Sequence, residues 1–532
     1  MINKNSLALR EVKLREKGDI VMNKFMNGLV DATNYITTEN GAISHHSTKS
    51  DLLDMFAMGA AMRNRSVEDV ILMFKKAYEE NPTYALKCLF YIGDCRGGQG
   101  ERRFFRVCIK WLANNYPDVM RRNIQYVPTY RRWDDLYALV DTPLETDAFA
   151  FMKNQLALDV QCKTPSLLAK WLKSENTSSK KSCELANRTR RAFGMTHKQY
   201  RKTLSILRAR INVLERLMSE NRWDEIEFDK IPSRAGMIYK NAFARHDLER
   251  AKSEKNVQTY EEFAKDITKK VNAKVLYPYE CVAEAMKVMY HARASMDDTN
   301  RLMVNKYWDN LADYFNGASF NGMAIVDTSG SMCGSEASAP INVAISLGLY
   351  CAEKAKGPYA GHFITFSSNP TFVKTEGVDF CDKVLRMSNA DWGGSTNVEA
   401  AFDLMLNVAI KNRLSQNDIP QNLIIISDME FDSCVTSGPV STSRWGSGYR
   451  IQNKDTLFET MAKKWASYGY QMPRLTFWNV DARQNNIPMR DDGYVTYVSG
   501  MSPVIFEQVM KGLTAWDLMM DKLNSERYAC IR

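Results

Sequence analysis

The chain has 532 residues, of which 45% are hydrophobic and 25% are charged. This composition is typical of a globular protein and excludes a disordered or fibrous chain, and the length predicts roughly two to four domains. The formal net charge of +9 is uneven: residues 1 to 300 hold 50 Lys and Arg against 38 Asp and Glu, and residues 301 to 532 hold 21 against 24. We therefore expect a polyanionic partner for the front half.

Residues 1 to 50 form an N-terminal segment without the apolar core of a secretory signal. No apolar stretch of the chain reaches the roughly 20 residues of a membrane span, so we expect no membrane crossing. Eleven cysteines are scattered from Cys88 to Cys530 without a C-x-x-C pair. This pattern is typical of reduced thiols in an intracellular protein, and we expect a cytoplasmic location.

From residue 51 to about residue 300 the apolar residues recur at helical spacing. In residues 101–117, for example, Phe104, Cys108, Trp111 and Leu112 fall on one helical face. Short breaks such as "DCRGGQG" separate successive segments. Consecutive helices of this kind stack most readily as an α-solenoid, although no crisp repeat period is visible. The clearest predicted helices are residues 51–64, 67–80, 101–117, 203–220 and 278–296.

The densest positive charge lies between Lys163 and Arg216, where fourteen basic residues face three acidic ones. Trp171, Phe193 and Tyr200 are interleaved with them. Basic residues that neutralise phosphates, with aromatic rings on which bases stack, are the ingredients of RNA binding. The alternative is a solvated helix face with core aromatic residues. The predicted phosphate contacts are Lys180, Lys181, Arg188, Arg190, Arg191, Lys198, Arg201, Lys202, Arg208 and Arg210.

From about residue 318 the pattern changes to short β-rich runs that alternate with helical segments. Such alternation predicts an α/β domain with a mostly parallel sheet covered on both faces. The expected division is thus a basic helical domain over residues 51–300 and an α/β domain over residues 316–532. The predicted strands are residues 322–327, 361–367, 422–427, 474–480 and 493–499.

Oxygen-bearing side chains follow three of these segments. Asp327, Ser329 and Ser331 come after the first strand, Thr396 lies in the loop "DWGGSTN", and Asp428 follows "NLIIIS". Ligands of parallel sheets sit beyond the carboxyl ends of the strands. Two carboxylates and three hydroxyls, without sulfur or imidazole, favour Mg²⁺, Mn²⁺ or Ca²⁺ over zinc, and an open coordination position would attract a partner's carboxylate. The alternative is that these residues only cap a helix and fix turns.

The same residues resemble a known motif. D-x-S-x-S after a first strand, a Gly-Gly-x-Thr loop and an Asp after a later strand look like the metal-ion-dependent adhesion site of von Willebrand factor A domains. The three pieces occur in the family's order over residues 316–532. The resemblance implies a Rossmann-like fold in which Ser329 and Ser331 bind Mg²⁺ directly, Thr396 binds directly or through water, and Asp327 and Asp428 bind mostly through water.

A helical half followed by such a domain resembles the TROVE family, the Ro ribonucleoprotein autoantigens and their uncharacterised viral and plant relatives. The resemblance implies a ring of HEAT-like helical repeats closed by the A domain. It also implies binding of small structured RNAs on the outside of the ring and of single-stranded RNA ends in its hole. The stretches that match are "TENGAISHHSTKSDLLDMF", "RGGQGERRFF", "RRWDDL", "SLLAKWLKSENTSS", "YRKTLSILR", "IPSRAGMIYKNAFARHD" and "VDTSGSM".

The sequence therefore predicts a non-enzymatic, RNA-binding ribonucleoprotein scaffold with a Mg²⁺-dependent interaction site in its A domain. The alternative is a metal-dependent protein-protein adhesion module, such as a structural or assembly component of a virus, that does not bind RNA. Hydrolysis by a metal-activated water would need a general base, and no His lies near the cluster in the sequence.

Overall fold

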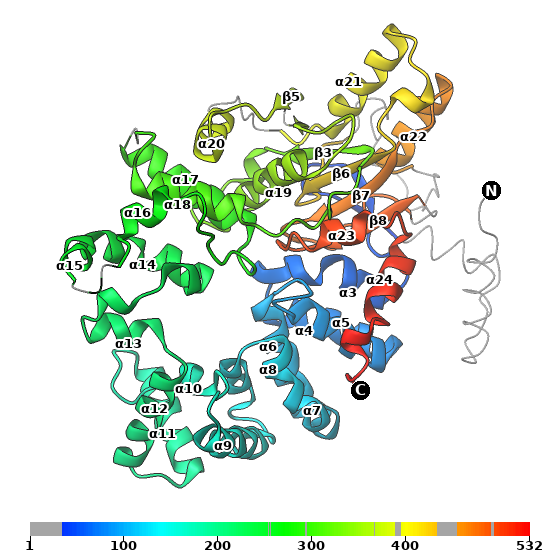
Figure 1. Cartoon of the computed structure of the whole chain (residues 1–532). Coiled ribbons are helices and arrows are strands. Elements are labelled where there is room, and N and C mark those ends of the chain that lie inside the picture. The colour runs from blue at the N-terminus through cyan, green and yellow to red at the C-terminus, as the bar shows by residue number, and fades with distance from the viewer. Residues whose placement is uncertain are drawn as a thin grey trace.

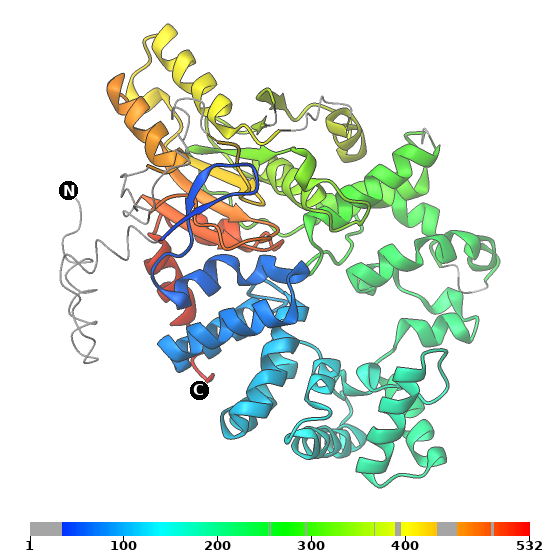
Figure 2. The same ribbon diagram turned by 180° about the vertical axis from the view of Figure 1, so that it is seen from behind.

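The computed structural model describes residues 34–253, 255, 257–292, 295–366, 368–388, 395–433, 455–490 and 494–532. Within these ranges the chain is helical from residue 51 to residue 309 and combines a six-stranded sheet with further helices from residue 322 onward. The prediction of a helical region followed by a mostly parallel sheet is confirmed. Figures 1 and 2 show that the helices follow an arc that begins and ends beside the sheet.

The helical region consists of short helices joined by tight turns and 3₁₀ segments. The helices are α3 (Asp51–Met58), α4 (Val67–Glu80), α5 (Pro82–Gly93), α6 (Arg102–Asn115), α7 (Pro117–Asn123), α8 (Val127–Tyr130), α9 (Glu145–Gln161), α10 (Leu168–Trp171), α11 (Lys180–Phe193), α12 (His197–Arg210), α13 (Leu214–Ser219), α14 (Ser233–Arg245), α15 (Asp247–Ala251), α16 (Tyr260–Lys265), α17 (Pro278–Ala292) and α18 (Thr299–Asp309). The 3₁₀ segments are η1 (Gly59–Asn64), η2 (Ile124–Tyr126), η3 (Trp133–Leu139), η4 (Trp223–Glu225) and η5 (Phe228–Lys230).

Local signals in the sequence set the boundaries of these helices. The Ser66 side chain accepts a hydrogen bond from the Asp69 amide at the start of α4, and Asn81 does the same for Tyr84 at the start of α5. Such caps satisfy amides that have no partner within the helix. Pro82 at the first position of α5 needs no amide partner at all. The turn between α4 and α5 is therefore sharp, and the two helices pack as a pair.

The two ends of the helical arc both contact the sheet-containing part of the chain. Helix α3 packs against strand β8, and α17 packs against α19 and α20. The last residues of the chain return to the turn after α5, where Arg527 and Tyr528 both bind the buried Asp94 carboxylate. The arc is thus closed at one end by α3 and the C-terminus and at the other end by α17.

The sheet has the strand order β5-β4-β3-β6-β7-β8, in which all neighbours are parallel except β4 and β5. All five predicted strands are present, and β5 is an addition at one edge. The strands are β3 (Gly322–Asp327), β4 (His362–Phe366), β5 (Thr371–Lys374), β6 (Asn422–Ser427), β7 (Arg474–Asn479) and β8 (Val495–Ser499). The accompanying helices are η6 (Gly330–Met332), α19 (Pro340–Lys354), α20 (Phe380–Ser388), α21 (Val398–Lys411), η7 (Gln416–Asp418), α22 (Leu457–Ser467), α23 (Ile505–Val509), α24 (Ala515–Leu523) and η8 (Glu526–Tyr528).

Helices cover both faces of the sheet, as the aromatic contacts of β7 show. Phe477 meets Phe458 of α22, with ring centroids 4.7 Å apart. The next residue, Trp478, meets Phe506 of α23 at 4.9 Å, and Phe506 in turn stacks on Tyr350 of α19. Because successive residues of a strand point to opposite faces, α22 and α19 must lie on opposite sides of the sheet. Double coverage explains why β3 and β6 are almost continuously apolar.

A short hairpin precedes the helical arc. Strands β1 (Tyr35–Thr37) and β2 (Ile43–His45) pair antiparallel and lie at the carboxyl edge of the main sheet, where His45 pairs with Ile487. The Asn40-Gly41 pair in its loop is a hairpin signal, and Gly41 has a φ of 93° that favours glycine. In the ranges that the structure describes, no helix is both long enough and apolar enough to cross a membrane.

Candidate functional site

Two of the predicted metal ligands lie at the point where the sheet reverses its strand order. From β3 the chain adds β4 on one side, and it later adds β6 on the other side. Asp327 ends β3, and Asp428 directly follows β6. The carboxyl ends of two such strands leave a crevice, which is where ligands of open parallel sheets bind. The fold therefore places both carboxylates at the position expected for a ligand site.

Asp327 is buried and surrounded by neutral hydrogen-bond donors. Its Oδ1 accepts the Ser329 amide at 2.9 Å, and its Oδ2 accepts the Ser427 hydroxyl at 2.5 Å. The Ser329 and Ser331 hydroxyl oxygens lie 3.1 Å apart. Burial, and then the neighbouring Asp428 carboxylate, raise the pKa of Asp327 above its usual range. An added cation would relieve this unfavourable placement of negative charge.

Asp428 and Thr396 have partners of their own. Asp428 is ion-paired to Arg483, with Oδ2 and Nη2 2.7 Å apart, and Arg483 also binds Glu39 at 2.8 Å. The Thr396 hydroxyl accepts a hydrogen bond from Nδ2 of Asn40 at 3.1 Å. A bound cation would therefore share Asp428 with a guanidinium and Thr396 with an amide. Asn40 and Glu39 are contributed by the loop of the N-terminal hairpin.

The hairpin loop is bound tightly to the segment after β6. The Thr38 hydroxyl donates to the carbonyl of Phe431 at 2.7 Å, and the Glu39 amide donates to Oε2 of Glu430 at 2.7 Å. Asn40 donates to the Glu430 carbonyl at 2.6 Å. Burial, with Glu39 and Asp428 nearby, raises the pKa of Glu430 to about 7. The site is consequently built from both the front and the back of the chain.

The donor set suits a hard divalent cation. It offers two buried carboxylates and hydroxyl oxygens, which are the ligand types of Mg²⁺ and Ca²⁺. Among the described residues, no three His, Cys, Asp or Glu side chains come together as a metal-binding group. Binding would consequently depend on Ser329, Ser331 and Thr396 as well as on the two aspartates.

The structure brings most of the predicted metal-site residues close to one another. Asp327, Ser329, Ser331 and Asp428 lie together, and Asn40 links Thr396 to the loop that carries Asp428. The Gly-Gly pair of the predicted Thr396 loop, residues 393 and 394, lies outside the described residues. Arg483 and the hairpin loop were not predicted as parts of the site. The Asn-Gly pair in "TENGA" was the available signal for the hairpin.

The ten predicted phosphate contacts lie on α11 and α12 and separate into two groups. Arg188 pairs with Asp141 and Glu145, Arg190 pairs with Glu175, and Arg208 donates to the carbonyls of Ala169 and Leu172. These three side chains, together with Arg210, which donates to the Val160 carbonyl, hold the helices to their neighbours. The other six, Lys180, Lys181, Arg191, Lys198, Arg201 and Lys202, are exposed and form no ion pair with any residue that the structure describes.

The aromatic residues of this region differ in accessibility. Phe193 and Tyr200 are buried in the core and cannot stack on bases. Trp171 is partly exposed and lies beneath the Arg132 guanidinium, 4.3 Å from the ring centroid. Only Trp171 of the three interleaved aromatic residues is therefore available to a ligand.

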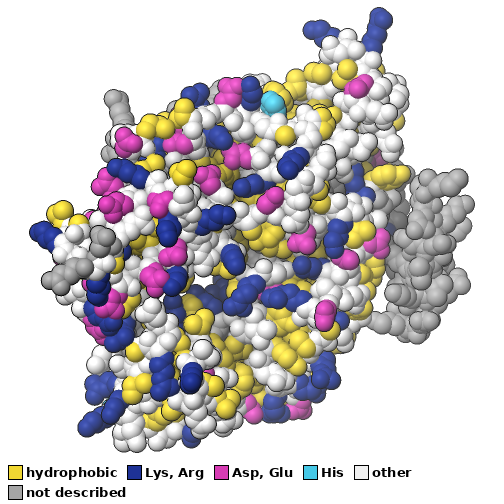
Figure 3. Space-filling model, in the orientation of Figure 1, with side chains coloured by type: hydrophobic (Ala, Val, Ile, Leu, Met, Phe, Trp, Pro, Cys, Tyr) yellow, Lys and Arg dark blue, Asp and Glu magenta, His cyan; other side chains and the backbone are white. Residues whose placement is uncertain are grey.

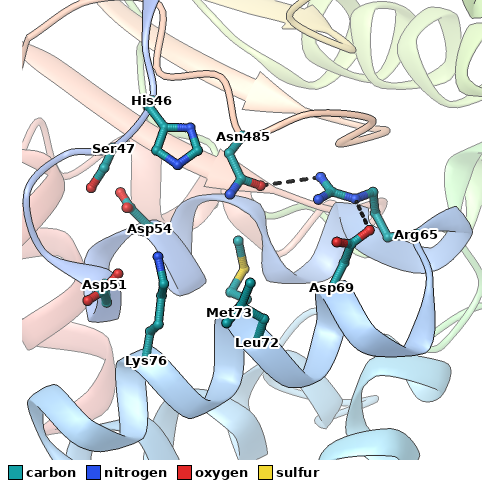
Figure 4. A pocket seen from close by; sticks show the side chains of 10 residues that line it. All are labelled: His46, Ser47, Asp51, Asp54, Arg65, Asp69, Leu72, Met73, Lys76 and Asn485. Carbon is teal, nitrogen blue, oxygen red and sulfur yellow. Dashed lines mark hydrogen bonds and ion pairs between the residues drawn. The ribbon is translucent and has the colours of Figure 1, made fainter. Parts of the chain in front are cut away.

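A small pocket lies on the other side of the hairpin, between it and helices α3 and α4 (Figure 4). Its volume is about 150 Å³, and at one side of it Arg65 binds both Asp69 and Asn485. Asp54 lies in the wall of the pocket, and burial raises its pKa to about 6. Hydrogen bonds that it accepts from Thr48 lower the pKa and offset part of this rise. Among the charged residues that line the pocket, Arg65 and Asp69 form an ion pair, and Arg65 also binds Asn485.

Comparison with known proteins gives a family but no activity. Residues 38–165 and 154–318, more than half of the chain, match the model of DUF2828, a domain of unknown function. The chain belongs to the DUF2828 family. Residues 321–526 match a second domain of unknown function, DUF7788. An uncharacterised protein of Acanthamoeba polyphaga mimivirus is 32% identical over 514 residues, which cover 89% of this DUF2828 chain and 84% of the viral protein. The boundary between the two matches falls just before β3.

Proposed function

We propose that this protein is a non-enzymatic, RNA-binding scaffold with a divalent-cation-dependent interaction site at the carboxyl edge of its sheet. The proposal extends the resemblance to the TROVE family and to von Willebrand factor A domains. The observation that carries the RNA-binding part is the group of Lys and Arg side chains on α11 and α12 that are exposed and form no ion pair within the described residues. The placement of Asp327 and Asp428 at the strand reversal supports the cation site.

The distribution of charge supports a polyanionic partner. Figure 3 shows Lys and Arg side chains gathered over the middle and lower parts of one face, which the helical arc forms. Cations on such a surface attract a phosphate backbone and release its counterions when it binds. The arc itself, which returns to the sheet at both ends, is compatible with a ring of HEAT-like repeats.

The cation-binding part is supported by the electrostatics of Asp327. A buried carboxylate with only neutral donors, next to a second carboxylate, is costly unless a cation is close. Mg²⁺ would be held by Asp327, Ser329, Ser331, Thr396 and Asp428. The bound ion would supply an electron-poor centre that attracts an acidic group from a partner.

Purification at low salt, followed by extraction of any bound nucleic acid, tests the RNA-binding proposal. RNA that copurifies and is released by raising the salt would support it. Protein that is free of nucleic acid and ignores added single-stranded and structured RNA would refute it. Mg²⁺ titration followed by thermal melting tests the cation site separately. An Asp327→Ala variant should lose any Mg²⁺-induced rise in melting temperature while it keeps its affinity for RNA.

A metal-dependent adhesion module without RNA binding is the second candidate. The observation that favours it is Glu39, a carboxylate already bound to Arg483 at the edge of the site. This edge can thus accommodate an acidic side chain. Under this alternative, Asp327→Ala abolishes the binding of a protein partner and nucleic acid has no effect.

A further inference from the structure

Three stretches of sequence that lie far apart along the chain meet in one cluster of charge. These are the start of α6, the segment before and within η3, and the end of α10 with the residues that follow it. Helix α6 packs against η3, and η3 packs against α8 and α10. We call the group of side chains at this meeting point the Asp134 cluster. Its members are Asp134, Asp135, Arg102, Arg106, Arg131, Arg132, Lys173 and Trp171.

Asp135 is the buried centre of the cluster. It accepts hydrogen bonds from Nε of Arg102 at 2.8 Å, from Nε of Arg106 at 2.5 Å and from Nε of Arg131 at 3.3 Å. Arg131 is itself buried and also donates to the carbonyl of Gly93 at the end of α5 and to that of Gly100 in the turn before α6. Three guanidinium groups on one carboxylate are more than charge neutrality requires.

Asp134 binds further cations at the surface side of the cluster. It lies 2.6 Å from Nη2 of Arg102, 3.3 Å from Nε of Arg132 and 3.6 Å from Nζ of Lys173. The five cationic side chains against two carboxylates leave the cluster with a formal charge of +3.

The excess charge faces solvent. Between 29% and 35% of the side-chain surface of Arg102, Arg106, Arg132 and Lys173 is exposed. Within the part of the chain that the structure describes, no hydrogen bond uses Nη1 of Arg102 or Arg106 or the terminal nitrogens of Arg132. Guanidinium groups with unused donors, held beside the same two carboxylates, match the oxygens of a phosphate. The buried aspartates hold these donors in place, so little side-chain freedom is lost on binding.

An aromatic surface adjoins these donors. The Arg132 guanidinium lies over the Trp171 ring, and Nζ of Lys170 lies 5.9 Å from the same ring centroid. Nucleic-acid bases stack on indole rings and on guanidinium planes when a strand is unpaired. The guanidinium groups can bind a phosphate, and the neighbouring Arg132 and Trp171 side chains can stack on a base. Together they can bind one nucleotide of a single strand.

We propose that the Asp134 cluster binds a phosphate of single-stranded RNA while an adjacent base stacks on the Arg132 and Trp171 pair. This inference rests on the proposed RNA-binding function and adds to it a site away from the exposed lysines of α11 and α12. The guanidinium groups of Arg102 and Arg106 orient the phosphate. Lys173 supplies additional positive charge.

Fluorescence polarisation with the full-length chain tests the site. The probes are a labelled oligouridine of about 12 nucleotides, which matches the span of single-strand sites, and the corresponding oligodeoxyuridine. The variants are Lys173→Gln, Arg132→Gln and Trp171→Leu, which leave Arg102, Arg106 and Arg131 on Asp135. Lys153→Gln, an exposed lysine on α9, is the matched control.

Arg132→Gln and Trp171→Leu should each weaken RNA binding by about tenfold, because each removes part of the stacking platform and one stacked base contributes about 1 to 3 kcal/mol. Lys173→Gln should also weaken binding, because it removes a positive charge beside the phosphate. The two charge variants should also reduce the salt dependence by about 0.7 in log-log slope. Ultraviolet crosslinking of unaltered protein should label the peptide around Trp171. This readout does not depend on how well any variant folds.

The outcomes separate this inference from the proposed function. If the unaltered chain binds RNA, but the three variants bind like Lys153→Gln and no crosslink maps to α10, the Asp134 cluster is not a binding site while the protein remains an RNA-binding scaffold. A chain that binds neither probe refutes both. Equal loss of DNA and RNA binding in the variants supports a phosphate and base site that does not read the 2′-hydroxyl.

Discussion

Replacement of Arg483 by glutamine should destabilise the protein in the absence of divalent cations and much less in their presence. Arg483 joins Asp428, whose side chain is fully buried, to Glu39 on the hairpin loop. Removing one partner of a fully buried ion pair costs about 3 to 5 kcal/mol. The Arg483 side chain is 30% exposed, so solvent screens the pair in part and we expect a smaller loss of stability, about 2 to 3 kcal/mol. For a unit of the size of the sheet region, this lowers the melting temperature by roughly 5 to 10 °C.

Mg²⁺ should reverse most of this loss because it replaces the missing positive charge beside Asp428. Saturation at about 100 times the dissociation constant adds about 2.7 kcal/mol to the stability of the form that binds. Without the competing guanidinium, the affinity for Mg²⁺ should also rise by about tenfold or more. The assay is thermal melting of the unaltered chain and of Arg483→Gln, in chelator and across a Mg²⁺ titration. Arg245→Gln on α14, an exposed position away from the sheet, is the control.

Two results would contradict this reasoning. An Arg483→Gln variant that melts with the unaltered chain in chelator would show that the guanidinium does not compensate Asp428. A chain that gains no stability from Mg²⁺, with or without Arg483, would remove the cation site from the proposed function.

The remaining predictions concern pH, the hairpin and salt. Burial raises the pKa of Asp54 from 3.8 to about 6, so the folded state binds the proton more tightly than the unfolded chain. Stability should therefore fall by about 3 kcal/mol as the pH rises from roughly 4 to 6, and Asp54→Asn should flatten this part of the curve of melting temperature against pH. Asn40→Ala should cost about 1 to 2 kcal/mol and speed proteolysis within residues 34–46, because Thr396 and the Glu430 carbonyl lose their donor. RNA affinity should fall by roughly 300-fold between 50 and 200 mM salt if six phosphates are neutralised, which filter binding across a salt series would detect.

The sheet was predictable because its strands are buried on both faces. Runs such as residues 423–426 are continuously apolar, lie between polar residues and alternate with amphipathic segments, so both their type and their order could be inferred. Strand β5 escaped prediction because three of its four residues are exposed at the edge of the sheet. The arc of helices was predictable as a series of helices, but its closure depends on contacts between α3 and β8 that have no local signature.

The site was predictable to the extent that its residues follow strands. Asp327 and Asp428 stand at strand ends, and parallel strands bring such ends to one edge. Arg483 could not be found this way because only its place in the folded loop makes it a partner of Asp428. Charge density alone also does not separate the basic residues of α11 and α12, where Arg190 binds a carboxylate and Arg208 binds backbone carbonyls. Exposure, which the sequence does not give, separates the available cations from the structural ones.

The hairpin joins the two matched regions into a single site. Its loop belongs to the DUF2828 region, and the loops that it contacts belong to the DUF7788 region. If the DUF7788 region folded without the hairpin, the Phe431 carbonyl and the buried Glu430 carboxylate would lack the hydrogen-bond donors that Thr38 and Glu39 provide. Each such loss costs about 1 to 3 kcal/mol, and the apolar surface of β8 that α3 covers would add to it. Changes at the proposed cation site should consequently alter the stability of the start of the helical arc, which follows the hairpin directly in the chain.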